Sequence, residues 1–168
     1  LSRPLENAPH PLQGTVDPDS LLTHRSFETK EDELQWVAEQ IHDDIFVEGL
    51  EPEQILVIPL SGQKYEGKKS KRYVHETLGD YLSRDDIGLH AVWNTDETET
   101  DNAFSQPGAV TLSRINRAKG NEAASVYVVG VDSTTEEEWR GEELQRRNQL
   151  FVALTRSRAW CCLTGCTP

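Results

Sequence analysis

Near its C-terminal end the chain reads R-N-Q-L-F-V-A-L-T-R-S-R, from Arg147 to Arg158, and continues into the apolar run Ala159–Leu163. The apolar spacing of the first segment predicts a helix, and the compact apolar run after it predicts a buried strand. Arginines border this unit at both ends: Arg146, Arg147, Arg156 and Arg158. Arginines at the C-terminal end of a helix either complement its macrodipole or bind an anion. The unit therefore predicts a helix and a strand that together offer positive charge at their junction.

The rest of the chain repeats this alternation of helical patterns with short aliphatic strands. Thr29 predicts a helix N-cap, with Asp32 as the acid of a capping box, and the helix should end near Gly49. A second helix is predicted from the spacing of Val74, Leu78, Tyr81 and Leu82. Strands are expected at His24–Phe27, Ile55–Leu60, Leu89–Trp93, Val110–Ile115 and Val126–Val131. The alternation predicts an α/β fold of three layers, with a mostly parallel central sheet flanked by helices.

The length of 168 residues suits one domain with a core of its own. Residues 1–20 are rich in proline and polar side chains, so we expect a linker or a frayed N-terminal segment there and a single domain over residues 21–168. The chain contains no methionine, which indicates a piece of a longer protein. Neither a membrane-spanning run nor a signal peptide is visible, so we expect a cytoplasmic protein without membrane contact.

The formal charge of −12 argues against a general coat for nucleic acid. Basic residues nevertheless gather in three stretches: Lys64–Arg72, Arg114–Lys119 and Arg146–Arg158. Acidic residues gather elsewhere, in Asp96–Asp101 and Glu136–Glu143. The basic stretches form either one basic surface on an acidic body or separate solvated faces.

The cysteines lie close together, at Cys161, Cys162 and Cys166. A metal site would need further ligands at suitable spacing, and the sequence offers none, so no metal site is expected. Cys161 and Cys162 are adjacent in a predicted strand and should face opposite sides of the sheet. We expect reduced core thiols.

One segment nearly spells a phosphate-binding loop. Gly62–Ser70 reads G-Q-K-Y-E-G-K-K-S, close to G-x-x-x-x-G-K-[ST], and lies between a predicted strand and a predicted helix. Asp132, at the end of a later strand, would supply the carboxylate for magnesium. Such a loop needs a hydroxyl directly after its lysine to bind Mg²⁺, and Lys69 stands there instead. A self-contained small NTPase that uses Gly62–Lys69 is therefore an alternative, and not the favoured interpretation.

Two motifs in the second half of the chain resemble those of a known family. Val110–Gly130 reads V-T-L-S-R-I-N-R-A-K-G-N-E-A-A-S-V-Y-V-V-G, which is a strand, a tight basic turn and a second strand. This segment resembles motif V of superfamily 1 helicases of the UvrD/Rep type, and Arg147–Arg158 resembles their motif VI, in the same order and at a matching distance. Phe27–Glu33 and Ile55–Leu60 resemble the opening of the same domain.

The resemblance implies the second of two RecA-like motor domains, which in the full-length protein hold ATP and Mg²⁺ between them. Arg156 would act as an arginine finger on the γ-phosphate. Glu122 would bind the nucleotide ribose, and Gly120 would let the backbone turn tightly beside the phosphates. Lys119 would serve either ATP or DNA. The implied partner is the N-terminal RecA-like domain of the same protein, and no cofactor is expected on this fragment alone.

The resemblance also implies contact with single-stranded DNA or a DNA junction. Ser61 and Gln63 match the loop that touches the backbone of the strand, and Lys64 adds charge suited to phosphates, unless this loop is simply solvated. Asn116 stands where many relatives carry a DNA-contacting histidine. Its amide can still bond to phosphate or base, although it cannot stack as an imidazole does.

The motor interpretation carries a geometric expectation for Arg156. Its guanidinium should be free of a buried salt bridge and should lie at the sheet edge where the strands end, and any other position counts against the motor interpretation. The segment between Trp93 and Val110 is short, so no large insertion domain is expected. We expect part of an ATP-dependent DNA helicase that is inactive as an isolated fragment. A non-catalytic docking domain that keeps the helicase fold is the second alternative.

Overall fold

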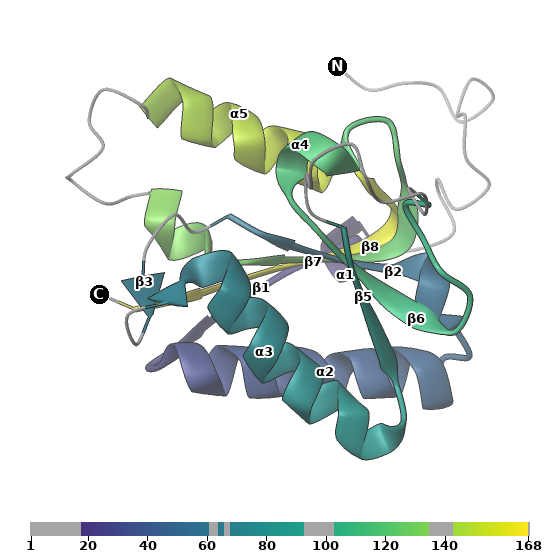
Figure 1. Cartoon of the computed structure of the whole chain (residues 1–168). Helices are drawn as coiled ribbons and strands as arrows, with labels where there is room; N and C mark the ends of the chain where they lie inside the picture. Colours follow the sequence, from purple (N-terminus) through teal and green to yellow (C-terminus); the bar gives the residue numbers. More distant parts are fainter. Residues whose placement is uncertain (1–17, 61–63, 66–67, 93–102, 135–142, 168) are drawn as a thin grey trace, which may run out of the picture.

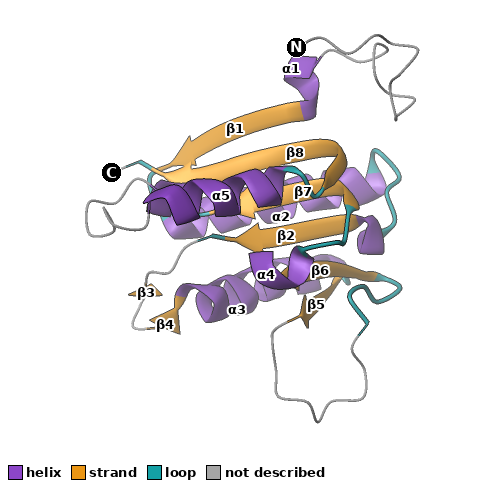
Figure 2. Ribbon diagram, turned by 90° about the horizontal axis from the view of Figure 1, so that it is seen from above, coloured by secondary structure: helices purple, strands orange, loops and turns teal. Residues whose placement is uncertain are grey.

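The computed structural model describes residues 18–60, 64–65, 68–92, 103–134 and 143–167. Its core is one six-stranded sheet, in which every pair of neighbouring strands is parallel. The strands, in their order across the sheet, are β1 (Leu22–Phe27), β8 (Ser157–Cys166), β7 (Ala123–Val129), β2 (Ile55–Pro59), β6 (Ala109–Ser113) and β5 (Gly88–Val92). Figure 2 shows this order from above. The predicted α/β fold with a mostly parallel central sheet is confirmed.

Helices cover both faces of the sheet and complete the three layers (Figure 1). α2 (Lys30–Phe46) and α3 (Ser70–Leu82) lie on one face, and α4 (Ile115–Ala118) and α5 (Glu143–Leu154) lie on the other. A short helix, α1 (Pro18–Leu21), precedes β1 and crosses the predicted boundary at residue 20, so the domain limits stay a prediction. Single 3-10 turns occur at Pro52–Gln54, Ser83–Asp85 and Val131–Thr134. Among the described helices, none has the length and apolar character needed to span a membrane.

The sheet is buried on both sides because its central strands are apolar at nearly every position. In β7, Tyr127 and Val129 pack into the core beneath α2 and α3, whereas Val126 and Val128 pack into the core beneath α4 and α5. β2 has no exposed residue in its first four positions. The two apolar cores hold the strand ends in fixed positions, and these ends carry the polar residues described below.

Adjacent cysteines of β8 divide between the two cores. Cys161 belongs to the α4–α5 side and Cys162 to the α2–α3 side, as the strand alternation predicted. All the cysteines are free thiols. Burial raises the pKa of the Cys161 thiol to about 12 and that of the Cys166 thiol to about 11. Both thiols therefore stay protonated near neutral pH, which agrees with the predicted reduced core thiols.

The start of α2 follows the sequence prediction with one change. Thr29 is the N-cap, and its hydroxyl oxygen accepts a hydrogen bond from the Asp32 backbone N–H at 3.1 Å. In a capping box the acid would accept from the backbone of the N-cap residue. Here the Asp32 carboxylate instead accepts from the Thr29 hydroxyl, at 2.6 Å. The cap is confirmed, and the predicted role of Asp32 is corrected.

A small hairpin stands where a basic loop was predicted. β3 (Lys64–Tyr65) pairs with β4 (Lys68–Lys69) in antiparallel register, and α3 begins directly afterwards at Ser70. In a phosphate-binding loop the lysine and the following hydroxyl residue open the helix. Here the lysines of the motif belong to an extended strand instead. This geometry weighs against the self-contained NTPase alternative.

Candidate functional site

The turn after α4 meets the end of α5 at the sheet edge where β7 and β8 begin. The Ala123 backbone N–H donates to the Arg156 carbonyl oxygen at 3.0 Å, which joins the two segments. Gly120 has φ +84°, a conformation that L side chains rarely adopt. The predicted tight turn at Gly120 is therefore present. It holds Lys119 and Glu122, which are both exposed, on either side of the glycine.

The Arg156 guanidinium is held beside this turn by neutral oxygen atoms. Its Nε donates to the Val152 carbonyl at 3.1 Å, its Nη1 to the Asn121 carbonyl at 3.5 Å, and its Nη2 to the Thr155 hydroxyl at 3.0 Å. The side chain is half-buried, and it forms no ion pair with any acid in the described ranges. Arg156 thus caps the carbonyl end of α5, as one interpretation of the sequence had it, yet its charge is not neutralised.

The position of Arg156 corrects one expectation. The guanidinium is free of a buried salt bridge, as expected, but it lies where β7 and β8 begin rather than where the strands end. The reason is the crossover geometry. A helix that connects two parallel strands runs antiparallel to them, so its C-terminal end reaches the start of the next strand. Lys119, Gly120 and Glu122 precede β7 and lie at the same edge, so all four predicted ATP-binding residues, Arg156 included, lie near this edge.

A groove of about 330 Å³ separates α4 from α5. Two predicted site residues of the basic turn, Asn116 and Lys119, line it from one side. The other side is lined by Asn148 and Gln149 of α5, over an apolar floor that includes Val152. The sequence analysis missed these two amides. The signal was available, because they are polar residues one turn before the apolar end of the same predicted helix.

The structure does not bring all the predicted DNA-binding residues together. Ser61 and Gln63 lie outside the described residues, and only the backbone of Lys64 is described, in β3. Asn116 is exposed in the first turn of α4, three residues after the end of β6. The assignment of these residues to DNA binding therefore stays a prediction.

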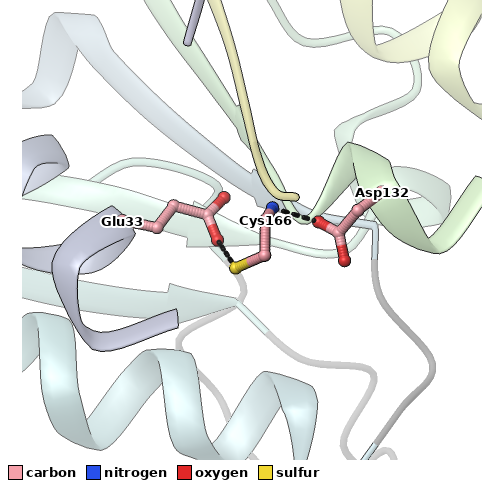
Figure 3. A group of neighbouring side chains, drawn as sticks. All are labelled: Glu33, Asp132 and Cys166. Atoms are coloured by element: carbon pink, nitrogen blue, oxygen red, sulfur yellow. Dashed lines mark hydrogen bonds between the residues drawn. The ribbon is translucent and has the colours of Figure 1, made fainter. Parts of the chain in front are cut away.

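A buried polar network, which no sequence motif indicated, joins α2 to the ends of β7 and β8 (Figure 3). The Glu33 side chain is fully buried, and its Oε1 accepts from the Gly130 backbone at 2.9 Å and from the Thr164 hydroxyl at 2.6 Å. Its Oε2 forms an ion pair with the buried Lys30 ammonium. Asp132 accepts from the Cys166 backbone at 3.0 Å and lies 3.8 Å from Lys30 Nζ.

This network has the donor set of a metal site but does not fit a metal. Ligand atoms of Glu33, Asp132 and Cys166 lie within 4.8 Å of one another. The Lys30 ammonium already supplies a positive charge to both carboxylates, and the raised pKa of Cys166 disfavours the thiolate that a metal requires. The sequence contained a weak signal for the pair, since Lys30 and Glu33 share the helix face of the core residues Leu34, Val37 and Ile41.

The parallel α/β sheet, the glycine turn before β7 and the arginine that ends α5 define the class of the domain. Residues 109–164, which include the glycine turn, the arginine and the strands β6, β7 and most of β8, match the family described as the UvrD-like helicase C-terminal domain. The predicted resemblance to UvrD-like helicases is therefore confirmed over the two motifs Val110–Gly130 and Arg147–Arg158, whereas Phe27–Glu33 and Ile55–Leu60 lie outside the matched residues.

Solved structures support the same fold. The chain is similar to the C-terminal domain of a possible DNA helicase from Lactobacillus plantarum WCFS1, with a TM-score of 0.56 and 16% sequence identity. The similarity covers 87% of this chain and 74% of that chain. At this identity the likeness concerns the fold alone. A comparison with curated protein sequences gave no match.

Proposed function

We propose that this chain is the C-terminal motor domain of an ATP-dependent DNA helicase or translocase, and that it supplies one half of a composite ATP site. The observation that carries the proposal is the un-neutralised Arg156 guanidinium beside the Gly120 turn. The planar guanidinium of arginine can bind two oxygens of one phosphate at once. The Arg156 guanidinium donates only to neutral acceptors, so its positive charge is available to a phosphate. The match of residues 109–164 to the UvrD-like family supports the same conclusion.

In this proposal the N-terminal motor domain brings the phosphate loop, the magnesium carboxylates and ATP itself to the edge where β7 and β8 begin. Arg156 exchanges its contacts with the Asn121 carbonyl and the Thr155 hydroxyl for oxygens of the γ-phosphate. The guanidinium then stabilises the charge of the transition state, an effect of roughly 10³ to 10⁵ in rate in comparable NTPases. Glu122 accepts a hydrogen bond from the ribose. Mg²⁺, when bound between the domains, neutralises the β- and γ-phosphates.

Two exposed apolar side chains on α5 suit contact with that N-terminal domain. Leu144 is 74% exposed and Phe151 is 66% exposed, on the helix that ends at the arginine finger. These two side chains lie two helical turns apart on the same face of α5, so a partner that packs on this face would cover both of them. Closure of the two domains on ATP would bury them, and this burial would couple nucleotide binding to domain movement.

Single-stranded DNA is the proposed second ligand. The groove between α4 and α5 offers the Lys119 ammonium for a phosphate and the amides of Asn116, Asn148 and Gln149 for sugar or base edges. Ser61, Gln63 and Lys64 of the basic segment would extend this contact along the strand. Such contacts are mostly electrostatic, so binding should weaken as salt rises.

The arginine finger is tested in a protein that contains both motor domains. Arg156→Ala should lower the kcat of ATP hydrolysis by about 10³-fold or more while nucleotide affinity changes only a few-fold. Arg156→Lys should remain strongly impaired, because an ammonium cannot grip two phosphate oxygens as the planar guanidinium does. Steady-state ATPase assays and equilibrium binding of a fluorescent nucleotide separate these two effects.

The matched control is Arg158→Ala, which removes an exposed arginine two positions along β8. This variant should keep kcat within a few-fold of the unmodified protein. Thermal unfolding of each variant checks that loss of the α5 cap leaves the domain folded. A kcat for Arg156→Ala within about tenfold of the unmodified value would end the arginine-finger proposal.

A further inference from the structure

A small cavity of about 170 Å³ lies on the α2 side of the sheet and shares no lining residue with the groove between α4 and α5. It is bounded by α1, α2, β1, β7 and β8. Its lining combines aromatic rings with polar groups, mainly Trp36, Tyr127, Trp160, Gln40, Asp44 and Thr23. Drug-sized ligands occupy cavities of about 300 Å³ or more, so this cavity suits a group of side-chain size.

Asp44 places a carboxylate in this cavity without a cation to balance it. Its Oδ2 accepts a hydrogen bond from the Tyr127 hydroxyl at 2.8 Å, and it forms no ion pair with any residue that the structure describes. Desolvation by burial raises the pKa of Asp44 above its ordinary value, against the lowering effect of hydrogen bonds from Tyr127 and Ser125. A carboxylate has about four acceptor positions, so it can accept further N–H donors.

The aromatic walls favour the same kind of ligand. A cation over the face of a tryptophan ring is attracted by the ring electrons, and the effect grows as water is excluded. One face of the Trp36 ring already makes such a contact, because the Arg25 guanidinium carbon lies 4.9 Å from its centroid, so a ligand would use the opposite face of Trp36 and the ring of Trp160. Trp160 lines the cavity and is 42% exposed, so this wall of the cavity reaches the surface of the protein.

We propose that this cavity binds a cationic nitrogen group, either an alkylammonium or a guanidinium, with Asp44 as acceptor and Trp36 and Trp160 as walls. The group would donate N–H bonds at the acceptor positions of the carboxylate that Tyr127 and Ser125 leave open, and its alkyl stem would lie against the indoles. A free small amine and the lysine or arginine side chain of another protein both carry this chemistry. The proposal is independent of the ATP site, since none of its residues lies at the Arg156 turn.

Butylguanidinium and its neutral isostere butylurea provide the first test, on the unmodified 168-residue chain. The readout is the indole N–H resonances of Trp36 and Trp160 in ¹H–¹⁵N NMR spectra, assigned with Trp36→Phe and Trp160→Phe. Butylguanidinium should shift both resonances and saturate, and butylurea should not. Equal shifts with the two compounds, or no saturable shift with butylguanidinium, would overturn the proposal without any variant of Asp44.

Asp44→Asn provides the second test, because the amide oxygen can still accept from the Tyr127 hydroxyl. This variant should bind butylguanidinium at least tenfold more weakly, and circular dichroism should show an unchanged fold. The matched control is Asp43→Asn, which removes the same charge from a neighbouring side chain that is 60% exposed; its affinity should stay within about twofold. Undiminished binding by Asp44→Asn would contradict the proposal.

A blocked Gly-Arg-Gly tripeptide separates the two sources of the cation. If it binds more tightly than butylguanidinium, the cavity recognises an arginine presented by a polypeptide. If it binds more weakly, the opening admits only a small free cation. Both results are measured with the same indole resonances, and both require that Asp44→Asn weakens the binding.

Discussion

At the scale of single residues, Glu33 bonds to residues that are distant in the sequence, and no sequence pattern predicted these contacts. Its buried carboxylate binds the backbone of Gly130 and the hydroxyl of Thr164, and it is paired with Lys30. Glu33→Ala should lower the free energy of unfolding by roughly 3–5 kcal/mol, because it leaves a buried ammonium without its main partner. Urea denaturation measures this change.

The control for Glu33 removes both charges at once. Lys30→Met combined with Glu33→Leu should recover much of the stability that Glu33→Ala loses, since a well-packed apolar pair often replaces a buried ion pair at little cost. If the double variant is as unstable as Glu33→Ala, the hydrogen bonds to Gly130 and Thr164, rather than the charge pair, carry the stability.

Asp44 makes stability depend on pH in the opposite sense to a paired carboxylate. Its pKa in the folded protein is raised, so the folded state holds the proton more tightly, and stability falls as pH rises through the interval from the ordinary value of 3.8 to the folded pKa. Asp44→Asn removes this penalty. The variant should therefore be more stable than the unmodified chain near pH 7, and the difference should shrink as pH falls below about 4.

Denaturation curves of both proteins from about pH 3 to about pH 7 measure this difference. If the stability advantage of Asp44→Asn over the unmodified chain instead grew as the pH fell, the folded protein would be stabilising the Asp44 carboxylate. That result would also remove one support for the cation-binding cavity, because a stabilised carboxylate would already have a partner.

At the scale of elements, the end of β8 packs tightly against the turn that follows β7. A Cβ at Gly165 would lie 2.8 Å from Asp132 Oδ1 and 3.0 Å from the Asp132 backbone nitrogen. Gly165→Ala should therefore lower the free energy of unfolding by roughly 1–3 kcal/mol. Thermal and urea denaturation provide the measurement.

Gly79 is the matched control for Gly165. It lies inside α3, where an added Cβ would meet only the Leu89 side chain, at an ordinary contact distance of 3.6 Å. Gly79→Ala should stabilise the protein by roughly 0.5–1 kcal/mol, since alanine favours helix interiors. Destabilisation by both substitutions to a similar extent would rule out the packing explanation for Gly165.

The longer helices and strands were predicted correctly from the sequence. Each of them packs into the core, and this packing requires apolar residues at a regular spacing that the sequence shows. The Thr29 cap, the buried strand Ile55–Pro59 and the facing of Cys161 and Cys162 all agree with the structure. α4 was missed because four residues are too few to show helical spacing, and β3 and β4 because two-residue strands have no detectable alternation. The prediction for the edge at which Arg156 lies was wrong because α5 runs antiparallel to the strands it connects, so its C-terminal end lies where β8 begins.

The candidate site was harder to predict than the elements, because many of its contacts join distant parts of the chain. The turn at Gly120 and the arginine at Arg156 were found from local motifs. Glu33 bonds to Gly130 and Thr164, which lie 97 and 131 positions away, and Asp44 bonds to Tyr127, 83 positions away. Periodicity in one sequence cannot specify which of the polar residues on a helix will meet a given strand.

At the scale of the whole molecule, the structure separates three groups of polar residues. Arg156, Gly120 and Glu122 lie where β7 and β8 begin, and the Glu33 network lies where the same strands end. Asp44 lies in the cavity on the α2 side of the sheet. In the proposed motor, ATP binds at the first of these places only. The Glu33 network would keep β7 and β8 in register so that the Gly120 turn and Arg156 close on the nucleotide together.

ATP hydrolysis by the purified 168-residue chain tests most directly the claim that it holds one half of a composite site. We expect no magnesium-dependent turnover above background for the chain alone, and turnover that depends on Arg156 once the chain is joined to an N-terminal motor domain. Brisk magnesium-dependent hydrolysis by the isolated chain, abolished by Lys68→Ala and unaffected by Arg156→Ala, would contradict it and establish the Gly62–Lys69 segment as the nucleotide site.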